Sequence, residues 1–270
     1  MKFSVLMSLY YKENPDYLND CLASLFNQTV RADEVIIVFD GPVSADLTSV
    51  VDLWLSKLNI IIVPIDVNVG LGNALNIGLK HCTFDLVARM DTDDICLPER
   101  FEQQLSIFDR NEDISICGSS IDEFDESMSF LLGHRRVSVS NIDIVRDLPR
   151  KNPFNHMTVM YRKNHIISVG GYKHLPWMED WYLWIRLLSH GFKGMNIYSS
   201  LVFARTGDSM IGRRIGLDYV RSEWRLTKIK ISLGVVSPFV AYFIFLKRSI
   251  PRLLPKPILR FVYSISRKCG

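Results

Sequence analysis

The sequence of 270 residues has few cysteines and no arrangement that would let them act together. Its five cysteines are odd in number, scattered and never spaced as Cys-X-X-Cys, which argues against a disulfide framework and against a zinc site. We also expect no signal peptide, because the apolar segment after Lys2 is too short to precede a cleavage site and is more typical of a strand. Both absences predict a protein of the reducing cytoplasm.

Long hydrophobic runs are missing as well. The longest apolar run near the C-terminus covers residues 233–246, only 14 positions, and contains Pro238, whereas a membrane-spanning helix needs roughly 20 residues. We therefore expect this run to be buried or to lie at a membrane interface. Residues 247–270 contain no acidic residue but seven Lys and Arg, so the rest of the chain has a net charge of −4 against +3 overall.

The basic C-terminal segment has three interpretations. Nucleic-acid binding suits its charge but not its many apolar side chains, so we expect no nucleic-acid partner. Attachment to the anionic lipids of a membrane surface suits both features. A helix packed against the rest of the chain is the remaining alternative.

The N-terminal half alternates between two hydrophobic periods. Continuous apolar runs predict strands, and apolar residues at helical spacing predict helices between them. The strands are expected at residues 2–10, 34–39, 59–65 and 86–90, and the helices at 15–28, 45–58 and 70–81. This alternation predicts βαβ units and a parallel sheet covered by helices on both faces.

Later segments follow a looser pattern. An amphipathic helix is expected after Pro98, followed by a strand and a turn. Short strands mixed with one aromatic helix come next, and the last part is mainly helical. The expected ranges are 97–110 for the amphipathic helix, 114–125 for the strand and turn, 180–189 for the aromatic helix and 213–246 for the helical part.

Polar residues lie at the ends of three of the predicted strands. Tyr10 lies at the end of the first strand, Asp40 comes directly after the second, and residues 91–94 (Asp-Thr-Asp-Asp) follow the fourth. The carboxyl ends of parallel strands meet at one edge of the sheet, where ligands bind in α/β proteins. We therefore expect these side chains to converge on one crevice.

The acidic residues 91–94 allow two interpretations. They can form a solvated loop in which Asp94 or a neighbour caps the helix that begins near Pro98. They can also bind a hard divalent cation, since Mg²⁺ takes one or two protein carboxylates and completes its shell with water and phosphate oxygens. Their position at the sheet edge favours the cation.

No glycine-rich phosphate loop is present, neither GxxxxGK[ST] nor GxGxxG. Asp40 and the following glycine are compatible with a simple turn. At a strand end facing the crevice, however, the Asp40 carboxylate can accept the N3–H of a uracil ring, and Tyr10 can stack on that ring.

A second acidic pair, Glu179-Asp180, lies at the start of the aromatic helix. There the helix dipole alone is a sufficient reason for carboxylates. The pair is flanked by aromatic residues, among them Trp177 and Trp181, and an aromatic wall can hold a sugar ring. Apolar surroundings also raise a carboxyl pKa toward the range of a general base. Core packing is the alternative for the aromatics and is the expected role of Trp184.

Together these segments resemble the family 2 glycosyltransferases, which have the GT-A nucleotide-sugar-binding fold. The resemblance covers about residues 1–205, in the order SVLMSLYYKENPDYLNDCLASLFNQT, EVIIVFDGP, NVGLGNALNIGL, DLVARMDTDDICLPERFEQQL, NPFNHMTVMYRK and WMEDWYLWIRLLSHG. Bacterial enzymes of O-antigen and exopolysaccharide assembly are most similar. The resemblance implies transfer of a hexose, glucose or galactose, from a UDP-sugar to a sugar on undecaprenyl diphosphate.

The resemblance also implies roles for the residues of the crevice. Tyr10 and Asp40 correspond to the uracil-binding pair. Asp91, Asp93 and Asp94 correspond to the DxD-type motif, which holds the ribose and a Mn²⁺ or Mg²⁺ ion on the diphosphate. We expect Asp93 and Asp94 to be the metal ligands and Asp91 to serve the ribose or the loop.

In inverting members, the position of Asp180 is that of the catalytic base, with Glu179 as its rival. A carboxylate base would take the proton of the acceptor hydroxyl, while the metal would stabilise the departing UDP. A single displacement would invert the anomeric centre and form a β linkage from an α-linked donor.

The chain departs from the family pattern in two places. Phe39 replaces an aspartate before Asp40, and Leu75 replaces an arginine that could contact the diphosphate. We expect Arg205, Arg213 or Arg214 to supply that charge from a loop over the leaving UDP, although a solvated helix start explains this segment equally well. His156 either contacts phosphate or acceptor from a strand in the crevice or is a satisfied core histidine.

The expected organisation is a GT-A catalytic domain at residues 1–212 and a helical, membrane-associating extension at 213–270. Within the domain, residues 1–95 would bind the nucleotide and residues 96–212 the acceptor. The expected location is the inner face of the bacterial plasma membrane. Two other functions stay open: a sugar-nucleotide nucleotidyltransferase, and a non-catalytic assembly protein that keeps the fold.

Overall fold

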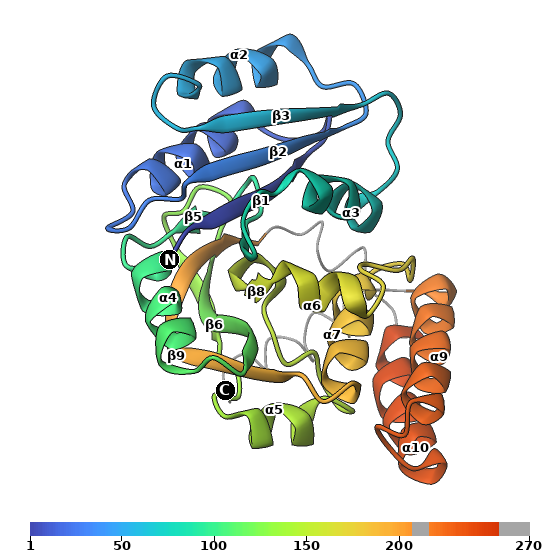
Figure 1. The fold of residues 1–270 in the computed structure, drawn as a ribbon. Coiled ribbons are helices and arrows are strands. Elements are labelled where there is room, and N and C mark those ends of the chain that lie inside the picture. Colours follow the sequence, from blue (N-terminus) through green and yellow to red (C-terminus); the bar gives the residue numbers. More distant parts are fainter. Residues whose placement is uncertain (207–215, 254–270) are drawn as a thin grey trace.

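A computed structural model describes residues 1–206 and 216–253. Within this part, nine strands form one mixed sheet in the order β3-β2-β1-β4-β8-β6-β9-β5, with β7 paired to β6 (Figure 1). The strands are β1 (Phe3–Leu9), β2 (Glu34–Asp40), β3 (Ile60–Ile65), β4 (Leu86–Arg89), β5 (Ile95–Cys96), β6 (Ile114–Phe124), β7 (Leu131–Arg135), β8 (Met160–Arg162) and β9 (Lys193–Arg205).

The first four strands form the predicted parallel half of the sheet. β1 pairs in parallel with β2 and β4, and β2 pairs with β3. Helices α1 (Pro15–Phe26), α2 (Ala45–Trp54) and α3 (Leu71–His81) connect these strands. The residues of the strands are apolar without alternation, because each face of the strands packs into a separate hydrophobic cluster. Val5 belongs to the cluster with α1 and α2, and Leu6 belongs to the cluster with α3.

The second half of the sheet is mostly antiparallel, which the sequence did not predict. β8 pairs antiparallel with both β4 and β6. In this half of the sheet, the pair of β6 and β9 is the parallel one. The segment expected to be a strand and a turn is β6, and a turn begins at Asp125, whose carbonyl accepts the Met128 N–H at 3.0 Å. The helices here are α4 (Arg100–Arg110), α5 (Asn141–Asp147), a 3₁₀ helix (His156–Thr158), α6 (Lys163–Ser168) and α7 (Glu179–Ser189).

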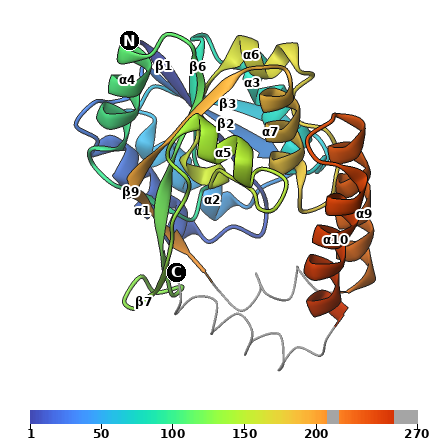
Figure 2. The same cartoon turned by 90° about the horizontal axis from the view of Figure 1, so that it is seen from below.

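Two helices end the described chain, as the apolar pattern predicted. α9 (Leu217–Ser232) and α10 (Pro238–Ser249) pack against each other, and a 3₁₀ helix (Ile250–Leu253) follows them. α9 contacts α7, so the pair lies beside the aromatic helix (Figures 1 and 2). Gly234 turns the chain between the helices at φ +67°, a conformation that glycine adopts without strain. Among the described residues, no helix is long and apolar enough to span a membrane.

Candidate active site

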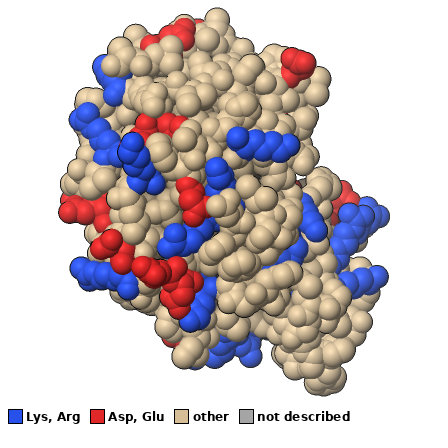
Figure 3. Space-filling view, in the orientation of Figure 1, with Lys and Arg blue, Asp and Glu red and all other residues tan. Residues whose placement is uncertain are grey.

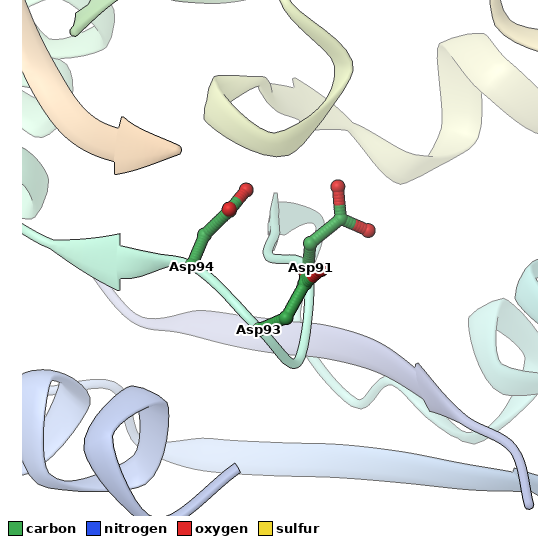
Figure 4. A group of neighbouring side chains, drawn as sticks. All are labelled: Asp91, Asp93 and Asp94. Carbon is green, nitrogen blue, oxygen red and sulfur yellow. The ribbon is translucent and has the colours of Figure 1, made fainter. Parts of the chain in front are cut away.

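The three aspartates after β4 lie on one tight turn between β4 and β5. Their carboxylate oxygens lie within 4.8 Å of one another, and Asp91 and Asp94 point to the same side of the turn (Figure 4). The capping interpretation is wrong, because α4 begins at Arg100 with Glu99 at its N-cap and without a side-chain cap. The negative charges of this turn therefore have no role in starting that helix.

Arg205, at the end of β9, holds this turn in place. Its backbone N–H donates to Asp94 Oδ1 at 2.9 Å, and its Nε donates to the Asp93 carbonyl at 2.7 Å. Its Nη2 donates to Asp20 Oδ2 at 2.6 Å, and the side chain is only 5% exposed. The prediction that Arg205 contacts the diphosphate does not match this geometry, because the guanidinium is already bound within the protein.

Arg89 is a site residue that the sequence reasoning missed. It is the last residue of β4, is 2% exposed and forms an ion pair with Asp91. Its Nε and Nη1 have no hydrogen-bond partner among the described residues. The available signal was an arginine inside an otherwise apolar strand, where an unpaired charge would be very costly.

Asp93 and Asp94 lie in an unfavourable electrostatic environment. Burial, together with the charges of Asp91 and Glu13, raises the pKa of Asp93 to about 7. Burial and the two neighbouring aspartates also raise the pKa of Asp94 well above its usual value. Asp94 Oδ2 is buried without a partner in the described part of the chain. Such an oxygen is suited to bind a divalent cation, and the cation would also relieve the repulsion between the neighbouring carboxylates.

A cavity of about 710 Å³ opens in front of this turn. Ten of the predicted site residues are among those that line it: Tyr10, Asp40, Asp91, Asp93, Asp94, His156, Trp177, Glu179, Asp180 and Arg205. Its described lining contains eight carboxylates but only three cations, Lys12, Arg89 and Arg205. A cavity of this charge would repel a nucleoside diphosphate unless a cation were bound as well.

Asp40 is the last residue of β2 and is 3% exposed. Its Oδ1 accepts the N–H of Val69 at 2.7 Å, and its Oδ2 accepts the N–H of Gly70 at 3.1 Å. The neighbouring Gly41 has φ +84°, and a Cβ there would lie 2.8 Å from the Asn68 nitrogen, so only glycine fits. Asp40 thus positions the loop before α3, while Tyr10 beside it is 37% exposed and open to a ring.

Glu179 and Asp180 begin α7 and face the same cavity. Asp180 Oδ2 accepts a hydrogen bond from Asn152 Nδ2 at 2.6 Å, and its Oδ1 accepts one from the Trp181 N–H at 2.7 Å. Burial raises the pKa of both carboxyls, and for Asp180 these hydrogen bonds and the charge of Arg135 offset part of the rise. The two oxygens of Asp180 are therefore fixed in direction, as a proton acceptor requires.

The aromatic residues around this pair divide into two groups. Trp177 is 44% exposed and has φ +65°, a strained conformation for a residue with a side chain. Trp181 is 3% exposed, and the Nζ of Lys230 lies 3.7 Å from its ring centroid, so it is not an open platform for a sugar as predicted. Trp184 is fully buried, as expected. The strain at Trp177 suggests a functional use for its exposed ring.

His156 lies in a 3₁₀ helix rather than in a strand, so the prediction of a strand at this position is wrong. Its Nε2 is 2.9 Å from the Tyr172 hydroxyl. Burial, and secondarily the charge of Arg89, lower the pKa of His156 well below its ordinary value. The imidazole is therefore neutral at pH 7. Arg213 and Arg214, the other predicted contacts of the diphosphate, lie outside the described residues.

Comparison with known proteins identifies the family to which the chain belongs. The profile of the family "Glycosyl transferase family 2" matches residues 4–174. The chain belongs to glycosyltransferase family 2. As a member of this family it is a glycosyltransferase, which favours that interpretation over a nucleotidyltransferase.

Two relatives of this family 2 glycosyltransferase match almost the whole chain. The amylovoran biosynthesis glycosyltransferase AmsE of Erwinia amylovora is 45% identical over 266 residues, which cover 98% of this chain and 99% of AmsE. A UDP-Gal:alpha-D-GlcNAc-diphosphoundecaprenol beta-1,3-galactosyltransferase of Escherichia coli is 37% identical over 262 residues, 97% of this chain and 95% of that one. The similarity therefore extends to bacterial enzymes of exopolysaccharide and O-antigen synthesis.

The structural comparison gives the same fold. The crystal structure of S. aureus TarS 1-349 in complex with UDP-GlcNAc matches with a TM-score of 0.69 and 18% identity. The match covers 92% of this chain and 71% of TarS 1-349. The fold is thus the GT-A fold that the motif order predicted.

The position of Arg205 allows a first prediction. Arg205→Gln removes the donors to Asp93 and Asp20, so the acidic turn should lose its fixed geometry. We expect the affinity for Mn²⁺ to fall about 10–100-fold, the usual effect of losing a group that orients metal ligands. Titration with Mn²⁺ under turnover conditions measures it. The matched control is Arg221→Gln, a 71% exposed arginine on α9 that should behave as wild type.

Proposed function

We propose that this protein is an inverting, metal-dependent hexosyltransferase that uses a UDP-sugar and a lipid-diphosphate-linked sugar acceptor. The observation that carries the proposal is that one cavity combines the acidic turn, with its unpartnered Asp94 oxygen, and the buried carboxyl of Asp180. These two features meet the two electrostatic requirements of the reaction. Negative charge develops on the leaving diphosphate, and a proton leaves the acceptor hydroxyl.

The metal site would consist of Asp93 and Asp94. A bound Mn²⁺ or Mg²⁺ would neutralise the diphosphate of the donor and stabilise the departing UDP. Asp91 is less suited to this role because Arg89 already pairs with it. Its side chain is 32% exposed, which leaves its second oxygen available to a ribose hydroxyl.

The general base would be Asp180. Its carboxylate is oriented by Asn152 and by the backbone of α7, and its partly raised pKa brings its basicity closer to that of the alcohol it must activate. The acceptor hydroxyl would donate its proton to Asp180 while its oxygen attacks the anomeric carbon. The bond to UDP would break on the opposite face, so the configuration would invert.

The substrates are proposed from the relatives. The Escherichia coli relative is named for transfer of galactose from UDP-Gal to GlcNAc-diphosphoundecaprenol. We therefore propose UDP-galactose or UDP-glucose as donor and GlcNAc- or GalNAc-diphosphoundecaprenol as acceptor, with a β-linked product. Tyr10 would stack on the uracil, and Asp40 would hold the loop beneath it or accept its N3–H.

The test is a screen of UDP-sugars against synthetic GlcNAc- and GalNAc-diphosphate-lipid acceptors, with and without EDTA. We expect one UDP-hexose to be used, activity to vanish in EDTA and return with Mn²⁺, and NMR of the product to show a β linkage. An α-linked product would contradict the single displacement. Full activity in EDTA would contradict the metal site.

We also propose that α10 attaches the enzyme to the cytoplasmic face of the membrane. Five exposed apolar residues follow one another at helical spacing along α10 and the 3₁₀ helix after it: Phe239, Phe243, Leu246, Ile250 and Leu253. Phe239 is 84% exposed. The adjoining part of the surface in Figure 3, at the lower right, shows few charged side chains. In the sequence, residues 247–270 contain seven cations and no acidic residue, a composition that suits anionic lipid.

Replacing Phe239 and Phe243 by serine tests the membrane proposal. We expect binding to vesicles that contain phosphatidylglycerol to fall at least about 10-fold, because two large apolar side chains no longer enter the bilayer interface. Sedimentation with the vesicles measures it. The control is Tyr198→Ser, a 65% exposed aromatic on β9. Equal vesicle binding by the double variant would contradict the proposal.

A further inference from the structure

A second cavity of about 390 Å³ adjoins the first. His156, Met157, Trp177 and Asp180 line both cavities, so these four residues form the boundary between them. The proposed base therefore faces two spaces. A transferase with two substrates needs such an arrangement, because the hydroxyl and the anomeric carbon must approach each other from different sides.

The two cavities have opposite charge. The second is lined by five cations, Arg135, Arg136, Lys151, Arg248 and Arg252, and Asp180 is the single carboxylate of its described lining. The first contains eight carboxylates and three cations. Chemically, the second cavity is thus suited to an anion without any metal, whereas the first is not.

The cations come from segments far apart in the sequence. Arg135 ends β7, Lys151 follows α5, and Arg248 and Arg252 belong to α10 and the 3₁₀ helix after it. The side of the cavity toward the C-terminal helices also contains Tyr219 of α9, whose ring centroid is 5.9 Å from that of Trp177. The helices that carry the exposed apolar stripe therefore also form part of the basic cavity.

We infer that this basic cavity holds the diphosphate of the lipid-linked acceptor. The inference rests on the proposed function and extends it by locating the acceptor. With the diphosphate among the cations, the attached sugar would lie along the exposed face of Trp177 and reach Asp180. The lipid chain would leave past Arg252 toward the apolar stripe of α10 and the membrane.

Two of the cations can be changed without disturbing the fold. The Arg136 side chain is 34% exposed, donates to the Ser200 hydroxyl at 2.8 Å and lies 3.8 Å from the Asp122 carboxylate. The Lys151 side chain is 54% exposed and lies 3.1 Å from the Asp147 carboxylate. These contacts are with partly exposed side chains, so a diphosphate can replace them at little cost. The double variant Arg136→Gln/Lys151→Gln should therefore fold normally and lose two positive charges in the cavity.

The first experiment measures direct binding of geranyl diphosphate by calorimetry, in EDTA and without nucleotide. Under these conditions the acidic cavity repels the probe, so binding reports on the basic one. We expect the double variant to bind at least about 10-fold more weakly than wild type. The charge-preserving variant Arg136→Lys/Lys151→Arg and the control Arg146→Gln, a 64% exposed arginine on α5, should bind as wild type. Equal binding by wild type and the double variant would overturn the inference.

The second experiment compares two acceptors, GlcNAc-diphosphate-alkyl and the corresponding GlcNAc alkyl glycoside without the diphosphate. We expect the double variant to raise the KM of the diphosphate acceptor about 10–100-fold while kcat and the KM of the UDP-sugar stay unchanged. The KM of the glycoside should not change. An equal loss with both acceptors would overturn the inference and leave the proposed function intact. If wild type glycosylates neither acceptor but the binding result holds, the proposed function fails instead.

Anionic lipid headgroups share the chemistry of a phosphate, so a third measurement separates the two sources. Vesicles of phosphatidylglycerol should bind the double variant and wild type equally, because Arg136 and Lys151 line the cavity and do not belong to α10, which carries the apolar stripe. If vesicle binding falls as much as binding of geranyl diphosphate, the cavity is a headgroup site, and the acceptor assignment is wrong.

Discussion

Asp180→Asn is expected to lower kcat about 10³-fold while the KM of the UDP-sugar changes little. Asparagine has nearly the same shape as aspartate, but its amide cannot take a proton, and general-base catalysis contributes about 10²–10⁴-fold to such reactions. The hydrogen bond from the Trp181 N–H can still form on the amide oxygen. Release of UDP at saturating donor, measured together with Tm, separates loss of catalysis from loss of folding.

Glu179→Gln is the matched control for this prediction. Glu179 is the neighbouring residue on the same helix and lines the same cavity, but it lacks the hydrogen bond from Asn152 that orients Asp180. We expect its loss to reduce kcat less than about 10-fold. A larger loss for Glu179→Gln than for Asp180→Asn would assign the base to Glu179. Wild-type turnover in Asp180→Asn would exclude Asp180 from proton transfer.

Asp94→Asn should have a comparable effect for a different reason. Its Oδ2 is the buried oxygen without a partner on the acidic turn, and its replacement by an amide nitrogen removes a ligand of the metal. The cation contributes several kcal/mol by stabilising the leaving group, so we expect turnover to fall by about 10³-fold. The Oδ1 of the new side chain can still accept the Arg205 N–H, which keeps the turn in place.

Thermal unfolding distinguishes this metal-ligand role from a structural one. Wild type should gain stability on addition of Mn²⁺, because an ion that binds only the folded state stabilises it, and the variant should gain much less. Without metal, the variant should melt higher than wild type, because an amide avoids the cost of burying an ionisable carboxyl next to Asp93 and Asp91, the cost that raises the pKa of Asp94. Asp109→Asn, an exposed residue of α4, should match wild type in both measurements. Full Mn²⁺-dependent stabilisation of Asp94→Asn would exclude Asp94 as a ligand.

The sequence was informative wherever a local pattern of residues is compatible with a single type of secondary structure. The strands β1, β2 and β4 are largely apolar because both of their faces are buried, so their position and their place in a parallel sheet could be predicted. The acidic turn could be placed at the sheet edge for the same reason, since it directly follows a buried strand. The motif order was sufficient to assign the family and the fold.

The antiparallel half of the sheet could not be predicted from the same patterns. β8 has three residues and β5 has two, which is too short for any period to appear. The environments of Trp181 and Arg205 were also beyond local reasoning. Each is set by a partner that is remote or on another element, such as Asp20 for Arg205, 185 positions earlier in the chain.

The sequence by itself therefore determined the family, the parallel half of the sheet and the acidic residues that meet at its edge. Only the tertiary structure decided how the charges are distributed between two cavities. Arg135, Lys151 and Arg252 look like ordinary surface cations in the sequence and become one basic cavity beside Asp180 only when β7, α5 and the C-terminal helices come together. Electrostatic interactions depend on distance in space, and the chain order of these residues carries no information about that distance.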